Sequence, residues 1–145
     1  MAITQAICNT FKEELLQGDH NFDSGGDVFK LALYTSAATL NSATTAYTAT
    51  SEIGDTGTYS AGGGTLVNSG TSQIGGVAFC DFADLSFTGV TLTARGALIY
   101  NTSATVTDAA VAVLDFTTDK SASDGTFTII FPADTSAAAI LRISG

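Results

Sequence analysis

From Phe29 onward, the apolar residues of this 145-residue chain follow a period of two. The run from Phe29 to Thr35 alternates large apolar residues with small or polar ones, as a strand with one buried face does. Turn-forming residues separate most of the later runs of this kind, which are Gly64 to Asn68, Gly76 to Asp81, Thr91 to Tyr100, Ala110 to Phe116, Thr126 to Phe131 and Ala139 to Ile143. Little between them has the period of a crossover helix. The spacing therefore predicts a mainly β fold, an antiparallel β-sandwich or barrel rather than a parallel sheet.

One α-helix is predicted, at residues 4–17, before the strands begin. Gly18 follows it directly and is the kind of residue at which helices end. The apolar residues that recur at every fourth position are Ile3, Ile7, Phe11 and Leu15. A stripe with this spacing lies on one face of a helix, and we expect it to pack on the domain's own core. The alternative is that the stripe forms an interface with a partner.

The length and composition predict a single folded domain, residues 1–145, in which residues 28–145 form the β-sandwich. Domains of roughly 100–150 residues are common, and the chain is 45% hydrophobic and only 13% charged, unlike a disordered sequence. The segment from about residue 40 to 76 is rich in Thr, Ser, Ala and Gly and includes the run Gly62 to Gly64. We expect it to hold short strands, or to be a flexible arm that orders on contact.

The charge distribution argues against nucleic acid and membranes as partners. Five Lys and Arg residues stand against 14 Asp and Glu residues, which gives a net charge of −9, and the basic residues are scattered. Phosphate binding requires clustered positive charge, and an acidic surface is repelled by anionic lipids. No apolar run approaches the roughly 20 residues of a membrane helix. The first residues lack the basic and apolar regions of a secretory signal, so we expect synthesis in the cytoplasm.

The sequence offers no catalytic, cofactor-binding or metal-binding residue set. His20 is the only histidine, and its polar neighbours predict an exposed loop residue. No G-x-S-x-G motif places a nucleophile, and no G-K-[ST] motif follows the glycine run. One histidine and two distant cysteines make a zinc site improbable. Cys8 and Cys80 are expected to be reduced, buried thiols, with a disulfide as the alternative.

Acidic residues gather in Asp81-Phe82-Ala83-Asp84 and between Asp119 and Asp124. Neither group matches a calcium-binding loop, and Asp at strand ends and turns usually accepts hydrogen bonds from nearby backbone amides. We therefore expect turns at both places, with a weak cation site at Asp119 to Asp124 as the minor alternative. Arg95 is the one charge within an otherwise uncharged strand. It is predicted to pair with a buried carboxylate or to cross a subunit interface, or else to extend into solvent at a sheet edge.

Several segments resemble small proteins encoded among the structural genes of tailed bacteriophages and prophages. The segments that carry the likeness are Met1 to Lys12, Phe29 to Thr35, Thr93 to Asn101 and Val113 to Phe116. The likeness runs over nearly the whole chain, with the stretch from Ala94 to Ala97 most distinctive. That family consists of virion structural proteins and has no catalytic motif to transfer.

The resemblance implies a virion component, best described as a decoration or cement protein on the outer surface of the phage head. Its partners would be the major capsid protein, other virion proteins and further copies of itself, in a homotrimer on local three-fold axes. The possible interface residues are Ile3, Ile7, Phe11, Leu15 and Arg95. The alternative is a tail, neck or fibre component. A third hypothesis, a carboxylate-dependent glycan hydrolase, has only the abundance of Asp in its favour.

Overall fold

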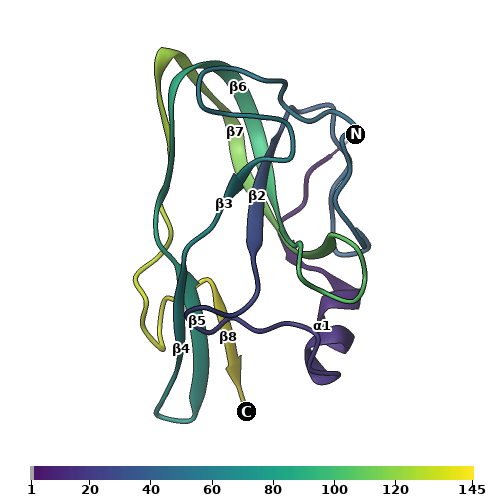
Figure 1. Cartoon of the computed structure of the whole chain (residues 1–145), viewed down its shortest axis with the longest axis vertical. Helices are drawn as coiled ribbons and strands as arrows, with labels where there is room; N and C mark the ends of the chain where they lie inside the picture. The colour runs from purple at the N-terminus through teal and green to yellow at the C-terminus, as the bar shows by residue number, and fades with distance from the viewer. Residues whose placement is uncertain (1) are drawn as a thin grey trace.

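The computed structural model describes residues 2–145 and shows a mainly β protein (Figure 1). Strands account for 49% of the residues and helix for 6%, and all the sheets are antiparallel. One short helix lies near the N-terminus, and the sheets are not closed into a barrel. The mainly β, antiparallel fold predicted from the period-two runs is therefore confirmed, and the barrel alternative is wrong.

Two sheets make up the fold. The larger has the strand order β1-β7-β6-β2-β3 and the smaller the order β4-β5-β8. The strands of the larger sheet are β1 (Ala6–Ile7), β2 (Phe29–Tyr34), β3 (Gly64–Thr65), β6 (Leu85–Asn101) and β7 (Ala109–Ile129). Those of the smaller sheet are β4 (Asn68–Ile74), β5 (Val77–Phe82) and β8 (Leu141–Ser144). Strand β4 lies largely outside the predicted strands, because its exposed polar sequence has no apolar alternation.

The hairpin of β6 and β7 is the longest element, and its two halves are buried differently. From Val90 to Ala94, buried residues alternate with exposed ones, whereas every residue from Gly96 to Asn101 is buried. Figure 1 shows the hairpin bending over at the top of the view, so that its halves lie in different parts of the molecule. The Asp119 to Asp124 segment, predicted as a turn, instead lies within β7. Its pairing with β6 continues through register shifts, which absorb the turn-forming residues as bulges.

Helix α1 (Asn9–Leu16) is shorter than the predicted helix of residues 4–17. Ile3 forms an isolated bridge with Leu40, and Ile7 belongs to β1, which pairs with β7. Pairing with distant segments of the chain satisfies the backbone of these residues, so the fourth-position spacing of Ile3 and Ile7 does not reflect a helix. The predicted end is confirmed: Gly18 has a φ of +78°, which glycine adopts without steric cost. No helix in residues 2–145 has the length and apolarity to cross a bilayer.

The Thr-, Ser- and Gly-rich region of residues 40–76 contributes short strands, as one of the two alternatives predicted. Part of it returns to the edge of β2, where Glu52 bridges to Tyr34. Gly63 (φ +82°) lies so close to β2 that a Cβ there would meet the Leu31 carbonyl oxygen. Tyr59 within this region is completely buried. Residues 40–63 thus form part of the protein body.

All four tyrosines of the chain meet around Glu52, in what we call the tyrosine cluster (Tyr34, Tyr47, Tyr59, Tyr100 and Glu52). The Tyr47 and Tyr59 hydroxyls and the backbone N–H of Gly62 all donate to the Glu52 carboxylate. The ring of Tyr47 stacks on that of Tyr100 at 4.9 Å between centroids. Burial raises the pKa of Tyr100 to about 12, so this phenol stays protonated and acts as a donor.

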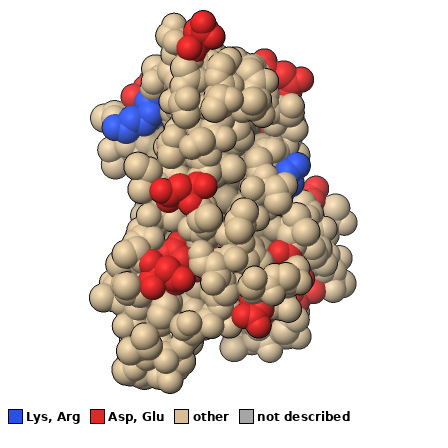
Figure 2. All heavy atoms as spheres, turned by 60° about the vertical axis from the view of Figure 1, so that its left-hand side comes forward, with Lys and Arg blue, Asp and Glu red and all other residues tan. Residues whose placement is uncertain are grey.

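Charge is spread thinly over the surface. Figure 2 shows carboxylate groups scattered over one face of the molecule, with few basic groups among them. This pattern agrees with the net charge of −9 and with the isolated positions of the Lys and Arg residues in the sequence. The face displayed therefore has no extended basic patch of the kind that follows a nucleic-acid backbone.

Candidate functional site

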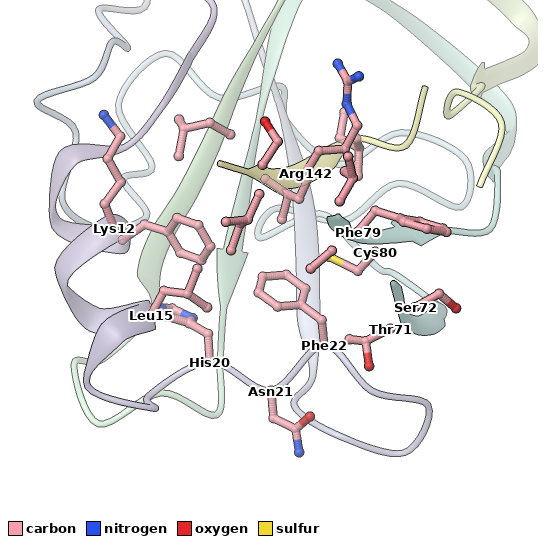
Figure 3. A pocket seen from close by; sticks show the side chains of 18 of the residues that line it. Lys12, Leu15, His20, Asn21, Phe22, Thr71, Ser72, Phe79, Cys80 and Arg142 are labelled. Atoms are coloured by element: carbon pink, nitrogen blue, oxygen red, sulfur yellow. The ribbon is translucent and has the colours of Figure 1, made fainter. Parts of the chain in front are cut away.

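An apolar groove lies between helix α1 and the three-stranded sheet (Figure 3). Its volume is about 1140 Å³, which exceeds that of most small-molecule pockets, at roughly 300–1,000 Å³. One wall is α1, the other is formed by β5 and β8, and His20 and Phe22 lie at the base. We call this feature the α1–β8 groove.

The helix wall of the groove consists of Phe11, Leu15 and Leu16. Phe11 is buried, whereas Leu16 is 91% exposed, so the apolar side chains run from the core to the rim. Two backbone hydrogen bonds hold the start of α1, from Cys8 N–H to the Val111 carbonyl oxygen (3.0 Å) and from Asn9 N–H to the Ser42 carbonyl oxygen (2.8 Å). The start of the helix is therefore fixed to β7 of the larger sheet and to the segment around Ser42, while its far end lies beside the groove.

The sheet wall is formed by β5 and β8, and two of their cross-strand pairs share one face of it. Ala78 pairs with Ile143 and Cys80 with Leu141, and paired residues of antiparallel strands point to the same face. Cys80 is buried, but Ile143 is 61% exposed at the rim. An exposed Ile143 and an exposed Leu16 thus border the same groove from opposite walls.

His20 at the base is buried, and its prediction as an exposed loop residue is wrong. Its ring lies between aromatic neighbours, with its centroid 4.8 Å from that of Phe11, and its Nε2 is 2.8 Å from Glu14 Oε2. Asn101 Oδ1 accepts from the Ser103 N–H, which turns Asn101 Nδ2 toward His20 Nδ1 at 2.9 Å. Nδ1 therefore accepts and Nε2–H donates to Glu14, which fixes the tautomer of the ring.

The charges at the groove have one sign. Lys12 on α1 and Arg142 on β8 both line it, and Figure 3 shows them on different walls. None of the described residues that line the groove has a side-chain carboxylate. Two of the chain's five basic side chains therefore line the groove, whereas none of its 14 acidic side chains does.

The two cysteines are free and buried, as expected from the sequence. Burial raises the pKa of the Cys8 thiol to about 11 and that of Cys80 to about 12, with neighbouring carboxylates adding to both shifts. A thiol needs a lowered pKa to act as a nucleophile near neutral pH. Cys80 therefore contributes a small apolar surface to the groove rather than a reactive group.

Three of the five predicted interface residues line the groove: Ile7, Phe11 and Leu15. Ile3 lies elsewhere, buried at its bridge to Leu40. Arg95 also lies elsewhere, on β6, where its Nε donates to Asp119 Oδ1 at 2.8 Å and both side chains are partly exposed. Arg95 thus pairs with a partly exposed carboxylate of its own hairpin, so the predicted pairing with a buried carboxylate is wrong.

Sequence reasoning missed the sheet wall of the groove. The short apolar alternation at Leu141 and Ile143 predicts a strand, but nothing local shows that this strand faces the helix. Leu16 is the one residue whose position in the sequence indicates the groove. It makes the apolar stripe of α1 wider than a helix needs for contact with its own core.

The chemistry of the groove is that of binding. Apolar side chains dominate it, and its polar groups are either already hydrogen-bonded or lie at the rim. Within residues 2–145, no group of three or more His, Cys, Asp or Glu side chains is placed to hold a metal ion. Comparisons of the chain with protein-family models, with characterised proteins and with solved structures find no significant match.

Proposed function

We propose that this chain is a structural protein of a tailed-phage particle that docks on other virion proteins through the α1–β8 groove. The sequence resemblance to phage structural proteins supports the setting, and the groove supports the docking role. Within that class, the proposed function is a decoration or cement protein on the outer surface of the head, which reinforces contacts between capsid subunits.

The single observation that carries the docking role is the exposure of apolar side chains on both walls of one groove. Leu16 and Ile143 are 91% and 61% exposed, and both line the groove with the buried Phe11 and Cys80. Isolated exposed apolar residues are common, but apolar residues that gather in one concave site mark a place where a partner binds. Covering them removes apolar surface from water, which favours association.

The charge of the chain supports a position on the outside of the head. With a net charge of −9, the protein would be repelled by the packaged nucleic acid. A homotrimer would present three grooves at once. Three weak contacts made together hold a protein much more firmly than one, because the second and third form at a high effective concentration.

Quantitative gel densitometry tests this function on purified particles of the phage that encodes the chain. A decoration protein is expected at a copy number comparable with that of the major capsid protein. A much lower copy number would favour the tail, neck or fibre alternative, and absence from the particle would contradict a virion role altogether. Light scattering on the purified chain tests the trimer, which a monomer at micromolar concentration would contradict.

A further inference from the structure

Strand β8 has an unpaired edge beside the groove. It pairs with β5 on one side, and no other strand within residues 2–145 pairs with its second side. Figure 1 shows β8 lying on the side of β5 that is nearer to α1. An unpaired edge presents backbone N–H and C=O groups that an added strand can complete.

The walls of the groove suit the side chains of such an added strand. Alternate side chains of a strand point to opposite faces of its sheet. A strand on the edge of β8 would therefore direct every second side chain into the groove, where Phe11 and Leu15 of α1 face Leu141 of the sheet. Apolar residues at these alternate positions would find apolar partners, while the remaining positions would stay in water.

The positive charges at the rim of the groove favour a binding segment with negative charge. Lys12 lies on the helix wall, and Arg142 lies at the rim of the sheet wall, on the face of β8 opposite to Leu141 and Ile143, where its Nη1 donates to the Ala137 carbonyl oxygen at 2.7 Å. Both side chains are exposed, and none of the described lining residues carries a side-chain carboxylate to offset their charges. A segment with acidic residues among its polar positions would complement these charges. A second copy of β8 on the same edge would instead bring two Arg142 side chains together, so like charges oppose pairing between copies.

We infer that the α1–β8 groove binds an extended, acidic segment of another protein, which adds as a strand to the free edge of β8. Its apolar residues alternate, and its carboxylates pair with Lys12 and Arg142. This inference rests on the docking role proposed above, for which it names the class of partner.

A peptide titration followed by NMR of the full-length chain tests the inference. The probe is an end-capped synthetic peptide, Asp-Ile-Thr-Val-Thr-Ile-Asp, compared at low salt with a version that has Lys in place of both Asp residues. We expect the acidic peptide to shift the amide signals of β8 and α1, to slow hydrogen exchange in β8, and to bind roughly tenfold more tightly than the Lys version, as two surface ion pairs allow.

Two modified probes test the strand geometry. In each, alternate backbone amides are N-methylated, so that one edge of the peptide cannot donate hydrogen bonds. Addition to β8 uses one edge of the peptide, and at least one of these probes should lose binding. Equal binding by both would overturn the strand addition, as would no binding of the acidic peptide at concentrations up to about 1 mM.

Charge-reversal variants test the selection. Lys12→Glu and Arg142→Glu should each reduce the preference for the acidic peptide, whereas Lys120→Glu, which makes the same change outside the groove, should leave it intact. A dimer by light scattering in which β8 is protected would show that a second copy occupies the edge, which overturns the inference. If the peptide fails to bind while densitometry finds the chain abundant in particles, the inference is wrong and the proposed function stands. If the peptide binds but the chain is absent from particles, the inference stands and the proposed function is wrong.

Discussion

The tyrosine cluster and the α1–β8 groove are two regions where distant segments of the chain meet, and they differ in how far their side chains are covered. In the cluster, Glu52 accepts three hydrogen bonds and Tyr59 is completely buried. In the groove, the facing segments leave apolar side chains such as Leu16 and Ile143 open to solvent.

The way the two regions are covered is the opposite of what their amino-acid composition suggests. The Thr-, Ser- and Gly-rich segment of residues 40–63 has the composition of a mobile arm, yet its backbone and its tyrosines bind it to β2. The apolar stripe of α1 has the pattern of a core helix, yet its end borders the open groove. Specific hydrogen bonds can therefore fix a segment that has little apolar content, while apolar content alone does not ensure that a surface is covered.

The largest expected effect is a loss of stability from a substitution in the buried part of the groove, compared with a substitution at its rim. Phe11→Asp places a charge in the core beside His20 and Phe22 and should lower the free energy of unfolding by about 4 kcal/mol. Leu16→Asp, five residues further along the helix, should change the free energy of unfolding by less than about 0.5 kcal/mol but abolish particle binding. Urea unfolding and a particle-binding assay measure the two effects. Equal stability loss in both variants would mean that the rim belongs to the core.

The next largest effect is the loss of stability on removing the central acceptor of the tyrosine cluster. Glu52→Ala removes the acceptor of the Tyr47 and Tyr59 hydroxyls and of the Gly62 N–H, and should cost about 3 kcal/mol in urea unfolding. Glu13→Ala is the matched control, because Glu13 is exposed and accepts one surface hydrogen bond from Gln17. If the two variants unfold at the same urea concentration, the cluster does not hold residues 40–63 in place.

A smaller effect concerns Asp81, a buried carboxylate of β5 that lacks the full set of partners that Glu52 has. Its Oδ2 has no hydrogen-bond partner, and burial raises its pKa above the ordinary value. The folded state therefore binds a proton more readily than the unfolded state, so the charge costs stability at neutral pH and the cost falls as the pH drops toward the ordinary pKa.

Asp81→Asn should accordingly stabilise the protein by about 1 kcal/mol at neutral pH, with the gain shrinking toward about pH 4. Thermal unfolding over this range measures it, with the exposed Asp124→Asn as the control. A gain that does not depend on pH would show that ionisation of Asp81 is not the cause.

The last prediction is kinetic and concerns the reactivity of the two thiols rather than stability. With pKa values of about 11 and about 12, Cys8 and Cys80 should react with Ellman's reagent at least about 100-fold more slowly in the native chain than in urea. The absorbance of the released thiolate gives both rates. Fast labelling of Cys80 in the native protein would show that the sheet wall of the groove is more open than the burial of Cys80 indicates.

The period-two runs were sufficient to predict the fold class, because alternation is a local property of each strand. The ends of the elements depended on distant partners: Ala6 and Ile7 join β1 through Val113 and Ala112, more than a hundred residues away. His20 was misjudged for the same reason, since its partner Asn101 is 81 residues distant. Local patterns describe one chain segment at a time, whereas burial depends on which segments meet.

The candidate site was predictable only in part. The fourth-position stripe identified Ile7, Phe11 and Leu15, which line the groove, but it also included Ile3, which lies elsewhere. Arg95 stood out by its charge, but its partner Asp119 lies on the neighbouring strand of the same hairpin. The opposite wall of the groove arises from the way β8 returns beside α1, which no local pattern encodes.

The central claim is that the open groove, and not the tyrosine cluster, is where this protein meets its partners. The most direct measurement is the copy number of Leu16→Asp and Ile143→Asp variants in phage particles, relative to wild type, by quantitative gel densitometry. We expect wild type in abundance and both variants nearly absent, although both fold normally by circular dichroism. Incorporation of the variants at the wild-type level would contradict the claim.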